Sequence, residues 1–178
     1  AGQMGSGIAH VFSLSHFNVQ LIDVSDDQLQ KAAHQIESNL GRQVAKGTIT
    51  EQQKADALQH IQYATAINQP GQIDLAIEAI VEKSELKARV FHELDCALKD
   101  GAIIATNTSS ISISQLASTT NRPDRVIGMH FMNPAPIMPL VEVIKGERTS
   151  DQTLNVILDL VLNLGKKPVA SKDAPGFI

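Results

Sequence analysis

The chain has 178 residues, 43% of them hydrophobic and 19% charged, with a formal net charge of −4. This length and composition are those of one globular domain with a sizeable core, and they exclude an intrinsically disordered chain. The acidic balance and an aromatic content of 3% also exclude the cationic surface and base-stacking platforms of a nucleic-acid-binding protein.

The cysteine content and the hydropathy pattern narrow the class further. Cys96 is the single cysteine, which excludes an internal disulfide and any CxxC redox or zinc motif. The sequence has no apolar run long enough to cross a bilayer and no basic-then-apolar signal segment. We therefore expect a cytoplasmic protein without a metal ion and without membrane or nucleic-acid partners.

Strand-like apolar runs alternate with helix-like amphipathic stretches along the chain. A glycine-rich loop at residues 1–7 comes first, with a helix expected from about Met4 to Phe12. In chain order, strands are then expected at residues 19–24, 61–64, 74–80, 102–106, 126–131 and 140–144. Helices between and after them are expected to begin at Ser25, Thr50, Ser84 and Ser150, with capping boxes at residues 25–28 and 50–53.

Two of the expected helices carry clear apolar stripes. The stripes consist of Leu86, Val90, Leu94 and Leu98 in one, and of Leu154, Ile157, Leu158, Val161 and Leu162 in the other. The alternation of strands and helices predicts an α/β fold, Rossmann-like and doubly wound, with a mostly parallel sheet. We expect residues 1–172 to form this domain, with its first strand missing, and residues 173–178 to begin a linker.

The glycine-rich loop matches part of the dinucleotide-binding fingerprint G-x-G-x-x-G. Gly2, Gln3, Met4 and Gly5 supply its second and third glycines, and the first would precede Ala1. Gly2 would let the backbone approach a pyrophosphate, Gly5 would allow close contact between helix and sheet, and the helix N-terminus would bind the phosphates. The alternative is an ordinary turn.

Asp23 supplies the second part of this fingerprint. It ends the next predicted strand, 18 residues after Gly5, close to the spacing of roughly 20 that the fingerprint requires. A carboxylate here would accept hydrogen bonds from both ribose hydroxyls and repel a 2′-phosphate, which favours NAD over NADP. Alternatively, Asp23 is a simple turn residue.

Glu142 lies inside the apolar strand 140–144. Because burying an unpaired carboxylate is costly, either Glu142 faces water on an edge strand or it has a buried partner. His130 is the candidate partner, since it lies near the end of a strand and ligands bind at the carboxyl ends of strands in an open α/β sheet. A His–Glu pair there would act as a general base whose tautomer the carboxylate fixes.

Short polar side chains follow another predicted strand, at Asn107, Thr108, Ser109 and Ser110. They are suited to hydrogen-bond a nicotinamide or a substrate oxygen. A strand-to-helix turn explains the same composition equally well.

Several segments together resemble the 3-hydroxyacyl-CoA dehydrogenases, with the bacterial branch that acts on 3-hydroxybutyryl-CoA as the nearest. The segments are residues 1–9, Ile77-Glu78-Ala79, residues 105–110, 128–134 and 140–144, and Pro175-Gly176-Phe177. The resemblance implies an NAD-dependent enzyme of two domains. This chain matches the N-terminal Rossmann-like domain; a C-terminal helical domain, absent here, would mediate homodimerisation and help to enclose an acyl-CoA substrate.

The resemblance also implies roles for individual residues. His130 is the implied catalytic base and Glu142 its orienting partner, with Ser109 contacting the substrate oxygen and the nicotinamide and Asn133 positioning His130 and the substrate. The implied cofactor-binding residues are Gly2, Gln3, Met4, Gly5, Asp23, Glu82, Lys87, Asn107 and Ser109. Lys46, on a helical hairpin over the CoA, would meet a CoA phosphate.

The implied reaction is the reversible oxidation of a short-chain (3S)-3-hydroxyacyl-CoA to a 3-ketoacyl-CoA, a step of fatty-acid metabolism. An alternative substrate is 3-hydroxyadipyl-CoA, from aromatic-acid breakdown. A second alternative is a non-catalytic NAD-binding or structural protein on the same scaffold, against which the intact His130, Glu142 and Ser109 argue.

Overall fold

The computed structural model describes residues 1–174, so the Pro175-Gly176-Phe177 segment lies outside the described residues. The chain divides into two compact units. The first unit comprises residues 1–68 and 133–137, and the second comprises residues 69–132 and the described residues from 138 onward. Within residues 1–174, no helix combines the length and the apolar character needed to cross a membrane.

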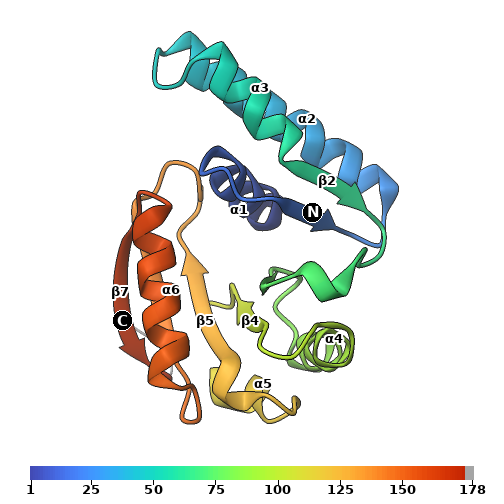
Figure 1. Ribbon diagram of the computed structural model, residues 1–178, viewed down its shortest axis with the longest axis vertical. Coiled ribbons are helices and arrows are strands. Elements are labelled where there is room, and N and C mark those ends of the chain that lie inside the picture. Colours follow the sequence, from blue (N-terminus) through green and yellow to red (C-terminus); the bar gives the residue numbers. More distant parts are fainter. Residues whose placement is uncertain (175–178) are drawn as a thin grey trace. The chain divides into compact units, whose positions relative to one another are not determined.

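The first unit is a parallel β1–β2 sheet packed with α1, α2 and α3 (Figure 1). Its elements in chain order are α1 (Gln3–Leu14), β1 (Val19–Ile22), α2 (Asp26–Ala45), α3 (Glu51–Gln59) and β2 (Ile61–Ala64). The helices α2 and α3 lie side by side as a hairpin. Apolar side chains from both strands and all these helices form its core, among them Ala9, Leu21, Leu29, Ala32, Ile36, Leu40, Ala57 and Ile61.

Side-chain caps fix where α2 and α3 begin, as predicted, although residues 25–28 form only the Ser25 cap and not the predicted capping box. The Ser25 hydroxyl accepts a hydrogen bond from the backbone N–H of Gln28 at 3.4 Å. Thr50 and Gln53 form a complete capping box, in which each side chain accepts from the other residue's backbone N–H. These bonds satisfy N–H groups that have no partner within their own helix.

The second unit is built on a sheet with the strand order β3-β4-β5-β6-β7. These strands are β3 (Leu75–Glu78), β4 (Ile103–Thr106), β5 (Val126–Phe131), β6 (Leu140–Lys145) and β7 (Lys167–Lys172). Its helices are α4 (Ser84–Ala97), α5 (Ile113–Ala117) and α6 (Asp151–Asn163), with 3₁₀ turns η1 (Pro70–Gln72) and η2 (Pro123–Arg125). Neighbouring strands are parallel except β5 and β6, which are antiparallel. The mostly parallel α/β architecture predicted from the sequence is therefore observed.

The β5–β6 contact requires a glycine at residue 128. Gly128 lies opposite Ile144 in the antiparallel register. A Cβ added to Gly128 would lie 2.8 Å from Ile144 Cβ and 3.0 Å from Ile113 Cδ1. Because the interior is packed to this density, α5 can approach the sheet only where β5 has no side chain.

Two predictions about helix faces and caps are wrong. Lys83 rather than Ser84 is the N-cap of α4, and no side chain of the described residues caps this helix. Leu86, placed on its apolar stripe, is 38% exposed, whereas Leu94 and Leu98 of the same stripe do pack in the core. The buried face of the helix contains Lys87, Phe91 and Asp95. The helix buries the face that contains Lys87, because the ammonium group of Lys87 forms an ion pair with the buried carboxylate of Glu78.

Other differences lie near the C-terminal end of the described residues. Leu162, predicted on the buried face of α6, is 58% exposed, and α6 is buried through Thr153, Ile157 and Val161. The strand β7 was not predicted, because its apolar and polar residues do not alternate and most of its side chains are exposed. It forms through main-chain pairing with β6, an interaction that apolar periodicity does not report.

Candidate active site and cofactor site

The N-terminus of α1 presents backbone N–H groups for an anion. Within the described residues no side chain caps this helix and no acidic residue lies in its first turn, so the N–H groups of Gln3, Met4 and Gly5 lack helical acceptors. A Cβ added at Gly2 would meet nothing within 4 Å, which leaves room for a group against the backbone. These features fit a dinucleotide pyrophosphate.

The glycine of α1 that is packed most tightly is Gly7, which was not assigned a role in the dinucleotide-binding fingerprint. A Cβ on Gly5 would make an ordinary contact, 3.9 Å from Leu21 Cδ1. A Cβ on Gly7 would lie 3.3 Å from the Ala135 Cβ, and Gly7 is therefore the more constrained position. The expected role of Gly5 in close helix–sheet contact is correspondingly weak.

Asp23 lies directly after β1, with its carboxylate held by backbone groups. Its Oδ1 accepts from the Ser25 N–H at 3.0 Å and its Oδ2 from the amino nitrogen of Ala1 at 2.6 Å. The group is an ionised acceptor at neutral pH, suited to ribose hydroxyls.

His130 and Glu142 form a hydrogen-bonded pair across β5 and β6. They are directly opposed in the antiparallel register, and His130 Nδ1 lies 2.5 Å from Glu142 Oε2. Their side chains are 20% and 8% exposed. With Nδ1–H donating to the carboxylate, the lone pair is on Nε2, which makes the imidazole a competent proton acceptor.

Asn107 ties the β4 end to the segment that carries His130. Its backbone N–H donates to the Glu78 carbonyl at 2.8 Å, and its Oδ1 accepts from the Phe131 N–H at 2.8 Å. Phe131 directly follows His130 in β5. Asn107 therefore holds the ends of β3, β4 and β5 together, in addition to the place beside the cofactor implied for it.

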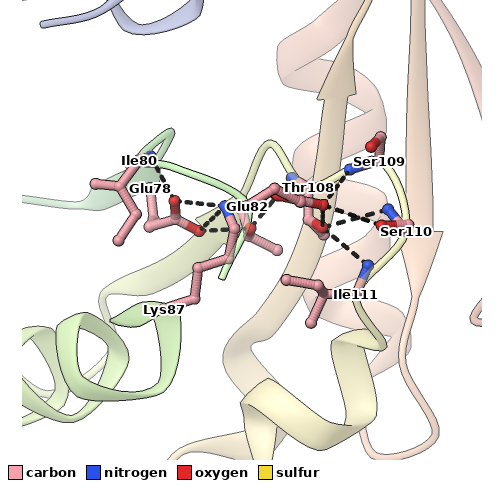
Figure 2. Close-up of polar contacts among 9 residues, drawn as sticks. Glu78, Ile80, Glu82, Lys87, Thr108, Ser109, Ser110 and Ile111 are labelled. Atoms are coloured by element: carbon pink, nitrogen blue, oxygen red, sulfur yellow. Dashed lines mark hydrogen bonds and ion pairs between the residues drawn. The ribbon is translucent and has the colours of Figure 1, made fainter. Parts of the chain in front are cut away.

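The loop after β4 is organised around the carboxylate of Glu82 (Figure 2). Its Oε1 accepts from the Thr108 hydroxyl, from the Ser109 N–H at 3.1 Å and from the Ser110 hydroxyl at 3.3 Å. Burial raises the pKa of Glu82, but the bond from Thr108 and the charge of Lys87 outweigh it, so this pKa lies below the usual range. Ser109 itself is exposed, with its hydroxyl directed away from Glu82 in Figure 2.

A buried ion pair lies behind this loop. Lys87 is 1% exposed, and its Nζ lies 2.7 Å from Glu78 Oε1 and 3.2 Å from Glu82 Oε2. Glu78 also accepts from the Thr106 hydroxyl at 2.7 Å and from the Ile80 N–H at 2.6 Å. Sequence reasoning assigned no role to Glu78, although it is a carboxylate inside an apolar strand, the same signal that singled out Glu142.

Two further predicted residues lie in the first unit. Asn133 Oδ1 accepts from Gln3 Nε2 at 3.1 Å. Lys46 is the exposed C-cap of α2, at the turn of the α2–α3 hairpin, which is the position the resemblance implied. Within residues 1–174 no group of three or more His, Cys, Asp or Glu side chains is arranged to hold a metal ion.

The α/β fold, the uncapped glycine-flanked helix, the acid after β1 and the His–Glu pair define a dinucleotide-binding domain of a dehydrogenase. Residues 1–174 match the family described as "3-hydroxyacyl-CoA dehydrogenase, NAD binding domain", and the chain belongs to this family. The predicted family, the Rossmann-like fold and NAD as its cofactor are thereby confirmed.

Relatives carry names that agree with the family. The chain is 50% identical over its full length to a 3-hydroxybutyryl-CoA dehydrogenase of Bradyrhizobium diazoefficiens and 42% identical to one of Clostridioides difficile, covering 61% and 63% of them. It is similar to the crystal structure of (S)-3-hydroxybutyryl-CoA dehydrogenase PaaH1 from Ralstonia eutropha, at 43% identity and a TM-score of 0.97. That match covers 99% of this chain and 62% of the other. The chain thus spans less than two thirds of the length of these relatives.

Proposed function

We propose that the whole protein is an NAD-dependent dehydrogenase that reversibly oxidises a short-chain (3S)-3-hydroxyacyl-CoA, such as 3-hydroxybutyryl-CoA, to the 3-ketoacyl-CoA. The observation that carries this proposal is the 2.5 Å contact between His130 and Glu142 near the carboxyl end of β5. The names of the relatives support the substrate class.

His130 is the proposed base. Its Nε2 removes the proton from the C3 hydroxyl of the substrate, and Glu142 stabilises the imidazolium that results. NAD, when bound, accepts the hydride from C3. In the reverse direction His130 returns the proton to the substrate oxygen. Ser109 is proposed to hydrogen-bond that oxygen, and Asn133 to position the substrate and His130.

The cofactor is proposed to bind through its phosphates and its adenosine ribose. The first N–H groups of α1, beside Gly2, have no side-chain cap and are proposed to bind the pyrophosphate, and the Asp23 carboxylate is proposed to bind the ribose hydroxyls. Because Asp23 is ionised, it repels the 2′-phosphate of NADP. Glu82, Lys87 and Asn107 are proposed to lie beside the bound cofactor.

The proposed partners are an acyl-CoA and a second copy of the protein. Lys46 is exposed at the turn of the α2–α3 hairpin and is proposed to contact a CoA phosphate. Dimerisation is proposed to occur through a C-terminal helical domain outside these 178 residues.

The test is turnover by the full-length protein with NADH and acetoacetyl-CoA, compared with longer and dicarboxylic 3-ketoacyl-CoA substrates. We expect the highest kcat/KM with acetoacetyl-CoA, and loss of turnover in His130→Gln but not in His92→Gln, which changes an exposed histidine of α4. A higher kcat/KM with the 3-keto form of adipyl-CoA would overturn the short-chain assignment. NADH binding without turnover of any acyl-CoA would show a non-catalytic protein.

A further inference from the structure

The loop that carries Ser109 is hydrogen-bonded to Glu82, which is ion-paired with a buried lysine of the second unit. Glu82 Oε1 accepts from three groups of residues 108–110, and its Oε2 faces the Lys87 ammonium at 3.2 Å. Thr108 extends this order, because its hydroxyl oxygen accepts from the N–H of Ile111 at 2.9 Å and of Ser110 at 3.3 Å. The loop is thus organised around a single carboxylate.

The ammonium group of Lys87 is surrounded by carboxylate oxygens of the protein. An ammonium group has three N–H donors, and Nζ lies within 3.2 Å of three carboxylate oxygens: both oxygens of Glu78, at 2.7 and 2.9 Å, and one of Glu82. The residue is also almost completely buried. Its donors are therefore directed at Glu78 and Glu82, and the ammonium group connects the two carboxylates.

Glu78 is what allows Lys87 to stay charged in the interior. An isolated buried ammonium group is strongly unfavourable unless a carboxylate pairs with it. Glu78 is itself fixed by the Thr106 hydroxyl and the Ile80 N–H, so its position is set by the ends of β3 and β4. Figure 2 shows the resulting continuous path from Glu78 through Lys87 and Glu82 to the loop.

We propose that Glu78, Lys87 and Glu82 form a positioning relay that holds Ser109 in place for the reaction, with Glu78 as the positioning residue at its buried end. The inference rests on the proposed function for the role of Ser109, but the ordering of the loop is a property of the protein itself. Glu78 acts through Lys87 and touches neither substrate nor cofactor.

The test separates loop ordering from stability. Glu78→Gln leaves Lys87 without its main counter-charge and is expected to lower the melting temperature. The double variant Glu78→Gln/Lys87→Met removes both charges of the pair, so stability should largely return. In the double variant Glu82 has lost its cation, and the loop should be less ordered than in the wild-type protein. Asp74→Asn is the matched control, because it removes the exposed partner of Lys99 beside the opposite end of β3.

Two readouts are made on the full-length protein. In the apo protein we expect faster hydrogen exchange at the amides of residues 109–111 in the double variant, with the rest of the second unit unchanged. With NADH and acetoacetyl-CoA we expect kcat to fall by about 10- to 100-fold, the usual effect of a small misplacement at a reacting centre. Asp74→Asn should change neither readout.

The relay is overturned by one clear combination of results. If exchange at residues 109–111 and kcat both return to wild-type values in the double variant, the Glu78–Lys87 pair is structural only. Loss of acyl-CoA turnover in the wild-type protein would overturn the proposed function instead, and the exchange data would still decide whether the relay orders the loop.

Discussion

His130 lies directly opposite Glu142 in the antiparallel register of β5 and β6, with 2.5 Å between Nδ1 and Oε2. Opposed residues of an antiparallel pair project to the same face of the sheet. The pairing of strands therefore places the carboxylate where it fixes the imidazole tautomer, without contributions from a loop.

The first prediction concerns this pair. His130→Gln should lower kcat by roughly 10²- to 10⁴-fold, the usual effect of a positioned acid–base group, with little change in NADH binding. Glu142→Gln should also lower kcat, because a neutral amide does not stabilise the imidazolium. Steady-state kinetics of both variants and of the double variant complete the cycle. Since Glu142 acts through His130, the double variant should lose little more than His130→Gln; additive losses would contradict the dyad.

The second prediction concerns cofactor choice. Asp23→Asn should narrow the preference for NADH over NADPH, because the charge that repels the 2′-phosphate is removed. The measurement is the ratio of kcat/KM for the two cofactors. Asp56→Asn, at a half-buried position on α3, removes the same charge elsewhere in the first unit and should leave the ratio unchanged. Equal use of both cofactors by the unaltered protein would show that Asp23 does not read the ribose.

The third prediction concerns acid stability. Asp173 accepts from the N–H groups of Ile113 and Ser114 and from the Ser112 hydroxyl, at 2.8–3.0 Å, and so caps α5. Burial raises the pKa of Asp173, but these hydrogen bonds outweigh it, so the folded-state pKa lies below the ordinary value of 3.8. Its stabilisation is present above that ordinary value and is lost as the pH falls through the lower folded-state pKa.

Urea unfolding at two pH values checks this assignment. Asp173→Asn should lower the free energy of unfolding by about 1 kcal/mol at neutral pH, the typical effect of losing a helix cap. The difference from wild type should shrink as the pH falls below 3.8 and through the lower folded-state pKa, because the carboxylate then becomes protonated in the folded state as well. Asp159→Asn, exposed on α6, is the control and should have no such pH-dependent effect. A difference that is constant with pH would assign the effect to packing rather than to charge.

The fourth prediction concerns the glycine of β5. Gly128→Ala should lower the free energy of unfolding by about 1–3 kcal/mol, because its Cβ would overlap Ile144 and the neighbouring side chains must move. Gly71→Ala is the matched control, since a Cβ there meets nothing within 4 Å. Chemical denaturation of the two variants makes the comparison. Equal stability of Gly128→Ala and wild type would mean that α5 can retreat from the sheet without cost.

The sequence by itself determined the features that depend on residues close together along the chain. The strand–helix alternation, the capping box of Thr50 and Gln53 and the order of most elements follow from periodicity and cap chemistry, which act over a few residues. Glycine-rich residues 1–7 and Asp23 likewise indicate NAD through their residue types and their spacing alone. His130 and Glu142 were recognisable because their residue types are unusual in their positions.

Tertiary structure decided which of these residues meet. The antiparallel register of β5 and β6 is a contact between segments that are separate in sequence, and a shift of one residue would turn Glu142 to the other face. Leu86 was predicted on the buried face of α4 and Lys87 was not, because periodicity treats a lysine as solvent-exposed, whereas the buried carboxylate of Glu78 stabilises Lys87 inside. β7 and the Asp173 cap of α5 were not predicted, because their hydrogen-bond partners lie far along the chain. Only folding brings β6 beside β7 and the start of α5 beside Asp173.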